Sequence, residues 1–117
     1  MEKNLDSIQE KIDQQNDDND QVLSFILGQE EYGVDILRVQ EIKGWEKTTP
    51  IPNTPKYVMG VINLRGAVVP VIDLRIRFGL DDMTYDDTTV VIIVRSAAAT
   101  GTQKIIGLVV DGVSDVY

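Results

Sequence analysis

The sequence predicts an all-β fold built from short strands. Three observations lead to this class. Short apolar, β-branched runs recur along the chain, the connections between them are short and polar, and almost no segment has the spacing of a long amphipathic helix. About seven strands joined in this way are typical of an antiparallel barrel or of a pair of small barrels.

The first predicted strands follow one another closely. Residues 22–28, VLSFILG, form an apolar run, and in residues 30–36, EEYGVDI, apolar side chains alternate with polar ones. Gly28 and Gln29 lie between the two segments and favour a hairpin. Residues 37–44 fit either a strand or a helical turn, and their periodicity leaves both open.

The central hairpin carries a charge at its turn. Two β-branched runs flank the tetrapeptide Leu64-Arg65-Gly66-Ala67. Gly66 suits the third position of a type II turn, where φ is positive, and Arg65 then takes the second position with its side chain in solvent. A buried arginine would instead need a partner for its charge. The sequence therefore predicts that Arg65 is exposed.

The C-terminal part contains a short helix and further strands. Asp73 is the predicted N-cap of one or two helical turns, and Gly79 is their left-handed stop. Residues 88–94 and 104–110 are predicted strands, separated by a loop over residues 96–103 that we expect to be flexible. The dipeptide Asp111-Gly112 predicts a type I′ hairpin into the last segment.

Residues 1–20 differ from the rest of the chain in charge. They hold seven acids and two lysines, whereas the whole chain has a net charge of -8. Leu5, Ile8 and Ile12 have helical spacing, but no other apolar residue completes a buried stripe. We therefore expect disorder here, with a short helix docked on a partner as the alternative, and a folded domain over residues 21–117.

Composition excludes several classes of function. The chain has no cysteine and no histidine, so disulfides, thiolate nucleophiles, imidazole bases and Cys/His zinc sites are ruled out. The acidic net charge argues against nucleic acid. The apolar runs of the chain are far shorter than the ~20 residues that span a bilayer, and the acidic N-terminus does not resemble a signal peptide. We expect a cytoplasmic protein without membrane insertion or cofactor.

Carboxylates leave one alternative open, a generic acidic barrel with ligand-binding or hydrolytic activity. Paired acids can act as general acid and base or bind hard cations. Against this, one of the acids already has a capping role and no EF-hand spacing is present. The carboxylates concerned are Asp35, Asp73, Asp81, Asp82, Asp86 and Asp87.

Three segments resemble the CheW-like family of bacterial chemotaxis adaptors. They read GQEEYGVDILRVQEIKG, TPKYVMGVINLRGAVVPVIDLRIRFG and IIGLVVDGVSDV, and the most specific element is the NLRG turn followed by VVPVIDLR. The resemblance runs from Val22 to Val116. It implies two intertwined small barrels similar to Src-homology-3 folds. It also implies a non-catalytic adaptor that couples the cytoplasmic tips of chemoreceptors to the histidine kinase CheA.

The resemblance further implies two binding surfaces. The receptor-facing residues would be Val39, Glu41, Gly60, Arg65, Val90 and Ile106. The kinase-facing residues would be Ile36 and Gly107. Arg65 is the leading candidate, because a planar guanidinium on a rigid turn can bind carboxylates or carbonyl groups, although a merely solvated turn arginine is the plainer alternative. Ile36 and Val39 fit either an exposed patch or the core.

Members of this family continue beyond the part that matches Val116, through further strands and a terminal helix. The resemblance therefore implies that residues 21–117 lack those elements and that the C-terminal part of the fold is incomplete. An open strand edge of low charge favours pairing with another chain. We expect the chain to self-associate by strand pairing or strand exchange.

Overall fold

The structure is a computed structural model that describes residues 5–13, 21–80, 84–96 and 104–117. The strands are β1 Val22–Leu27, β2 Glu30–Asp35, β3 Val39–Gly44, β4 Val58–Leu64, β5 Ala67–Asp73, β6 Val90–Ser96, β7 Lys104–Val110 and β8 Gly112–Val116. The helical elements are α1 Leu5–Asp13, the 3-10 turn η1 Ile36–Arg38, and α2 Leu74–Arg77. The expected all-β class is confirmed, and η1 followed by β3 resolves the ambiguous segment after β2.

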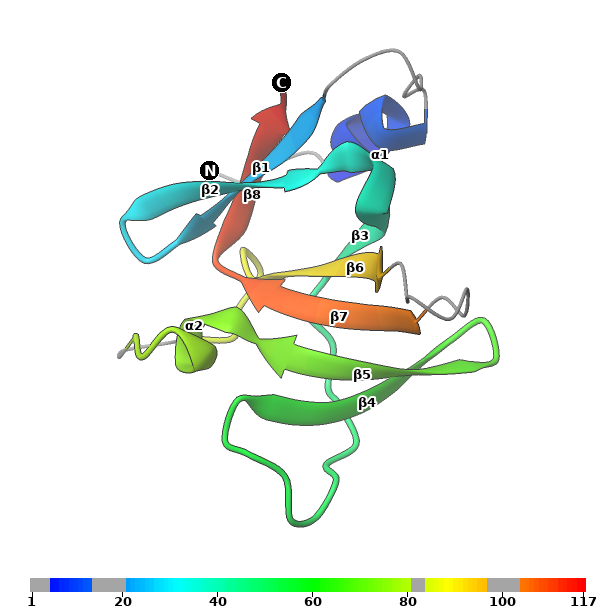
Figure 1. Cartoon of the computed structure of the whole chain (residues 1–117), viewed down its shortest axis with the longest axis vertical. Helices are drawn as coiled ribbons and strands as arrows, with labels where there is room; N and C mark the ends of the chain where they lie inside the picture. Colours follow the sequence, from blue (N-terminus) through cyan, green and yellow to red (C-terminus); the bar gives the residue numbers. More distant parts are fainter. Residues whose placement is uncertain (1–4, 14–20, 81–83, 97–103) are drawn as a thin grey trace.

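The strands form two sheets that lie one above the other in Figure 1. The smaller sheet has the order β2-β1-β8, and the larger has the order β3-β6-β7-β5-β4. The predicted hairpin of β1 and β2 is present, with Gly28 at a φ of 63° in its turn. One pair departs from the expected antiparallel pattern, because β5 and β7 run parallel.

Strand β6 joins two hydrophobic clusters because it is buried on both faces. Side chains alternate across a strand, so successive residues of β6 point to opposite sides of the larger sheet. Val90 and Ile92 belong to the cluster shared with β1, β3 and α1, whereas Val91 and Ile93 belong to the cluster enclosed by β4, β5 and β7. This two-sided burial explains why the sequence of β6 is a continuous apolar run.

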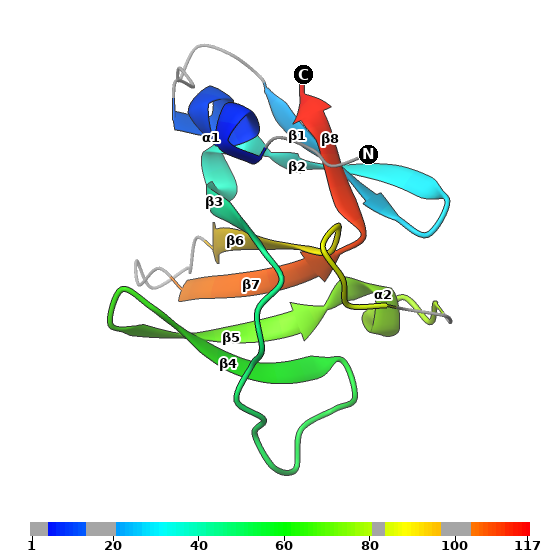
Figure 2. The same cartoon turned by 180° about the vertical axis from the view of Figure 1, so that it is seen from behind.

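The larger sheet curls until the chain after β3 reaches β4. Thr49 and Val61 exchange two backbone hydrogen bonds of 2.9 Å, and Figure 2 shows the segment after β3 crossing in front of the larger sheet. Gly60 permits the approach. It has a φ of 129°, and a Cβ atom at this position would lie 2.1 Å from the carbonyl oxygen of Thr49.

The predicted Asp111-Gly112 hairpin is wrong. Strand β8 pairs with β1 and not with β7, so Asp111 is a crossover between the two sheets. Its backbone N–H donates to the carbonyl of Ile26, and one carboxylate oxygen accepts a 2.7 Å hydrogen bond from the N–H of Gly28. These tertiary contacts replace the local turn that the dipeptide favours.

A buried ion network fastens this crossover to α2. The guanidinium of Arg75 donates to both carboxylate oxygens of Asp73, at 3.0 and 2.9 Å, and to Asp111 at 2.9 Å. The Tyr85 hydroxyl donates to Asp73 at 2.6 Å. Burial lowers the pKa of Arg75, but hydrogen bonds to Asp73 and Asp111 raise it by more. Asp73 also caps α2 through the N–H of Arg75, and Gly79 follows with a φ of 78°, as predicted.

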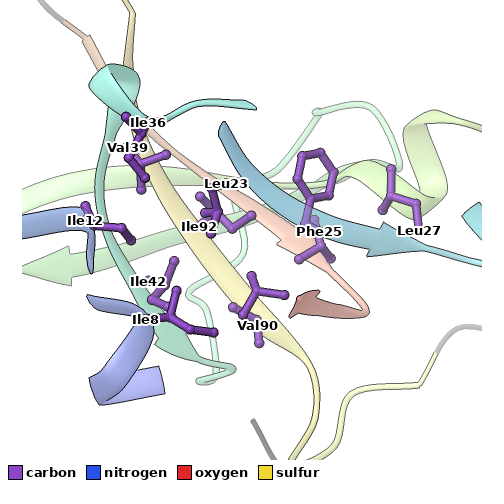
Figure 3. Close-up of a cluster of buried hydrophobic side chains, with 12 residues drawn as sticks. Ile8, Ile12, Leu23, Phe25, Leu27, Ile36, Val39, Ile42, Val90 and Ile92 are labelled. Carbon is purple, nitrogen blue, oxygen red and sulfur yellow. The ribbon is translucent and has the colours of Figure 1, made fainter. Parts of the chain in front are cut away.

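The N-terminal segment contains a docked helix where disorder was expected. In α1, Ile8 and Ile12 are buried in the cluster that β3 and β6 share. Figure 3 shows both side chains directed at the side of β3. Two buried isoleucines are enough to dock α1 because β3 supplies the rest of the apolar surface. The periodicity within α1 alone could not reveal this contribution of β3. No helix in the described part of the chain is long and apolar enough to cross a membrane.

Candidate interaction surface

The tip of the β4–β5 hairpin displays Arg65, as predicted. Its side chain is 72% exposed. The turn type, however, differs from the prediction. Arg65 and Gly66 have φ values of 50° and 87°, and two positive values are the pattern of a type I′ turn, which suits the twist of a hairpin better than type II. The side chain of Asn63 stabilises the turn by accepting a 2.9 Å hydrogen bond from the N–H of Gly66.

Arg65 reaches across to β3 and pairs with Glu41. Its guanidinium donates a 2.5 Å hydrogen bond to the Glu41 carboxylate, and this bond raises the pKa of Arg65. Glu41 is largely covered, with 17% of its side chain exposed. The structure thus brings together two of the predicted receptor-facing residues, which are 24 residues apart in sequence. Because Arg65 is so exposed, the pair contributes little to stability.

Beside this pair lies a polar groove of about 380 Å³ between α1 and β3. One wall is formed by residues of α1, the other by residues of β3 and the hairpin tip. The lining residues are Leu5, Gln9, Asp13, Gln40, Glu41, Ile42 and Arg65. An open groove with charges of both signs at its rim can receive a polypeptide segment, but it lacks the enclosed shape of a small-molecule site.

Gln9 connects the two walls of the groove. Its side-chain oxygen accepts a 2.9 Å hydrogen bond from the N–H of Ile42, and its amide nitrogen contacts the carbonyl of Gln40 at 3.5 Å. Strand β3 is an edge of the larger sheet, so these backbone groups face away from β6. Sequence reasoning missed Gln9. The helical spacing of Leu5, Ile8 and Ile12 was the available signal, since Gln9 follows the middle residue.

Most other predicted site residues lie inside the protein. Ile36, predicted to face the kinase, is fully buried, because η1 turns it inward while Leu37 points to solvent. Ile106 is partly exposed on β7. The buried members of the predicted set are Ile36, Val39, Gly60, Val90 and Gly107. The sequence left Ile36 and Val39 open between core and surface, and the structure buries both. The binding roles that the resemblance implies for these five residues stay predictions.

Packing explains the two buried glycines. Gly60 allows the close approach of Thr49, as described above. At Gly107, an added Cβ atom would lie 3.1 Å from Val91 and 3.3 Å from Val71, within the enclosed cluster. Gly107 therefore makes room for neighbouring side chains inside the sheet, and its implied contact with the kinase stays a prediction.

Three of the described carboxylates, Asp35, Asp73 and Asp86, have structural roles. Asp35 accepts from the N–H of Leu37 at the start of η1. Asp86 accepts from the hydroxyl and N–H of Thr88, and these bonds lower its pKa to about 2. Within the residues that the structure describes, no three acids are grouped to hold a metal ion. Asp81 and Asp82 lie outside the described residues, as does most of the predicted flexible loop, residues 97–103.

Comparison with known proteins assigns the family. The CheW-like domain family model matches residues 21–117. A chemotaxis protein CheW from Klebsiella aerogenes is 53% identical over 94 residues, which cover 80% of this chain and 54% of that protein. A probable chemotaxis protein CheW from Rhizobium etli is 42% identical, over 82% of this chain and 59% of its own length. This chain therefore spans little more than half the length of these relatives.

A solved structure agrees with the sequence relatives. The crystal structure of the scaffolding protein TtCheW from Thermoanaerobacter tengcongensis superposes with a TM-score of 0.74 and 39% identity, covering 84% of this chain and 64% of that one. The family match covers both sheets and the β4–β5 hairpin with its NLRG turn. The chain belongs to the CheW-like domain family.

Proposed function

We propose that this chain acts as a cytoplasmic chemotaxis adaptor that couples chemoreceptor tips to the histidine kinase CheA and catalyses no reaction. Membership of the CheW-like family and the scaffold named in the structural relative support this role. The observation that carries it is the Arg65–Glu41 pair, an exposed guanidinium held by a neighbouring strand at the rim of a groove.

The receptor contact is proposed to centre on Arg65. Because Glu41 orients the guanidinium, the side chain loses less freedom when it binds a carboxylate or carbonyl group on a receptor helix. Val39, Gly60 and Val90 are buried and would act through the packing beneath this surface. Ile106 is partly exposed and would extend the contact along β7.

Charge reversal tests the receptor contact. Arg65→Glu should leave the fold intact and weaken co-sedimentation with receptor tips, because it places repulsion beside Glu41 and any receptor carboxylate. Arg77→Glu is a matched control, since Arg77 is an exposed arginine on α2 at the other end of β5. Normal binding by Arg65→Glu, or an equal loss in Arg77→Glu, would contradict the role of Arg65.

The kinase contact needs a surface residue in place of Ile36. We propose Leu37, which follows Ile36 in η1 and has 43% of its surface exposed. Leu37→Glu should weaken CheA binding without unfolding, whereas Ile36→Glu should unfold the chain by burying an unpaired charge. A pull-down with CheA, together with circular dichroism melts of both variants, checks this. Kinase binding unchanged by Leu37→Glu would reject this contact.

Self-association is proposed to use β8. Within the described residues, this strand is an edge of the smaller sheet and pairs only with β1. Its exposed backbone groups can pair with a strand of a second copy. The acidic edge of β2, with Glu30, Glu31 and Asp35, is less suited because like charges would face each other. Light scattering at low micromolar concentration tests this, and a stable monomer would reject it.

A further inference from the structure

Helix α1 occupies the edge of β3 in a way that satisfies its backbone. Along an edge strand, every second residue turns its N–H and C=O away from the sheet. The side-chain amide of Gln9 contacts two such groups, accepting from the N–H of Ile42 and approaching the carbonyl of Gln40. The side chain of this one glutamine therefore bonds the outer backbone groups of β3 as a neighbouring strand would.

Apolar packing completes this contact. Ile8 and Ile12 are four residues apart, so they lie on one face of α1, and both are buried against the cluster that contains Val39 and Ile42. At the other end of the interface, Lys11 forms an ion pair with Asp115 of β8 at 2.5 Å. Helix α1 thus contacts the edge strands of both sheets, β3 and β8.

The covered surface coincides with the proposed receptor contact. Val39 lies under α1, and Glu41 and Arg65 share their groove with Leu5, Gln9 and Asp13 of that helix. Asp13 therefore stands on the wall of the groove that faces Arg65, where a receptor carboxylate would be expected. A second helix cannot reach the same strand edge while α1 is docked, because only one element can pair with the outer backbone groups of β3.

We propose that α1 is an internal competitor of the receptor: it docks on the β3 edge where a receptor helix binds, and it must leave before that helix can engage. This proposal rests on the proposed receptor role. The structure also defines the helix that fits, with two aliphatic residues four apart and a glutamine or asparagine between them. Helix α1 is suited to exchange, because its nine residues are fewer than the roughly 12–15 that an isolated helix needs, so it depends on docking for its order.

A disulfide that holds α1 in place tests this in the full chain. The natural sequence has no cysteine, so Gln9→Cys with Gln40→Cys introduces the only two thiols, at positions that already touch. The oxidised variant should bind a receptor-tip fragment at least about tenfold more weakly than the same variant after reduction, because the competing state can no longer open. Glu10→Cys with Lys56→Cys is a control for oxidation, since both positions are exposed and no contact between them is among the described interactions.

Release of α1 provides the opposite test. Ile8→Asp with Ile12→Asp should detach the helix and strengthen receptor binding, while Gln9→Ala should do so by less and leave the core untouched. Circular dichroism confirms that each variant is folded. In the natural chain, addition of receptor should speed hydrogen exchange of the α1 amides, a response that a purely structural helix would not give.

The outcomes separate the two proposals. If oxidised and reduced forms bind receptor equally, the competition is refuted and the receptor role stands. If binding is absent from the natural, reduced and released forms alike, the receptor role is refuted and the competition with it. Weaker binding of the oxidised form, relieved by reduction, supports both.

Discussion

The two ends of the β4–β5 hairpin each carry an arginine, and the two side chains have opposite environments. Arg65 at the turn is 72% exposed and bonds one glutamate, whereas Arg75 just beyond β5 is 2% exposed and bonds Asp73 and Asp111. A leucine precedes each arginine, but Asp73 lies two residues before Arg75, whereas no acid lies within five residues of Arg65. Burial is decided by the partners of each charge. Two carboxylates compensate Arg75 in the interior: Asp73, two residues before it, and Asp111, which is distant in sequence.

The difference separates recognition from architecture. At the tip, the charge of Arg65 is exposed to solvent and remains available to another protein. At the base, Arg75 ties α2 to the crossover between the sheets, and Tyr85 and the Gly28 turn join the same network. We therefore expect substitutions at the base to change folding and substitutions at the tip to change binding.

The largest effect is expected at Arg75. Arg75→Ala leaves the fully buried Asp73 carboxylate without its counter-charge, which should lower the free energy of unfolding by about 3–5 kcal/mol. Urea unfolding followed by circular dichroism measures this. Arg77→Ala on the same helix is the control, because Arg77 is exposed and contacts only the ring of Tyr57 among the interactions described, so it should change little. Equal losses in the two variants would show that the network adds no stability.

Gly60 is expected to give the second effect. It lies opposite Val71, towards the base of the hairpin, and a Cβ atom there would overlap Thr49 at a φ that side chains rarely adopt. Gly60→Ala should cost about 1–3 kcal/mol and break the Thr49–Val61 bridge. Gly44→Ala is the control, since an added Cβ at Gly44 meets no atom within 4 Å. Amide exchange at Val61 reports on the bridge, and unchanged protection there would contradict the steric argument.

Alkaline pH should weaken the base of the hairpin through Tyr85. Burial and the hydrogen bond to Asp73 raise the pKa of Tyr85 to about 12, above its ordinary value of 10.0. The folded state therefore holds the phenolic proton more tightly than the unfolded state does. Its contribution is complete below about pH 10 and is lost between about pH 10 and about pH 12. Tyr85→Phe should cost about 1 kcal/mol at neutral pH.

A comparison of melting temperatures isolates this contribution. Tyr85→Phe leaves every other titratable group in place, so the informative quantity is the difference between the natural chain and Tyr85→Phe. That difference should shrink as pH rises past 10. A constant difference across the range would show that Tyr85 keeps its ordinary pKa when folded.

Sequence reasoning succeeded where local chemistry decides the structure. The Gly28 turn, the Asp73 cap and the left-handed Gly79 depend on neighbours within a few residues, and all three were predicted. It failed where a distant partner decides. The hairpin turn predicted for Asp111-Gly112 does not form, because Asp111 instead bonds Gly28 and Arg75.

At the candidate site too, the features set by local sequence were predictable and those set by distant contacts were not. Exposure of Arg65 followed from its turn, but its pairing with Glu41 joins separate strands, and no periodicity within either strand predicts it. The burial of Ile36 depends on η1, and docking of α1 depends on the surface of β3. An apolar residue in a short strand can face either side of a small sheet, so these positions required the structure.

The smallest effect on stability, and the sharpest separation of the two ends, is expected from Arg65→Asn. Asn-Gly is the favoured pair for a type I′ turn, because asparagine tolerates a positive φ better than arginine does. The free energy of unfolding should therefore change by no more than about 0.5 kcal/mol, with an increase favoured. Receptor co-sedimentation should nevertheless fall, since the guanidinium is gone. Arg65→Lys is the companion variant, because it keeps the charge and loses the planar guanidinium. Partial receptor binding would indicate that the charge contributes, and full binding would indicate that the planar geometry is not required. If Arg65→Asn binds receptor like the natural chain, Arg65 is a solvated turn residue, and the distinction between a recognising tip and a structural base no longer holds.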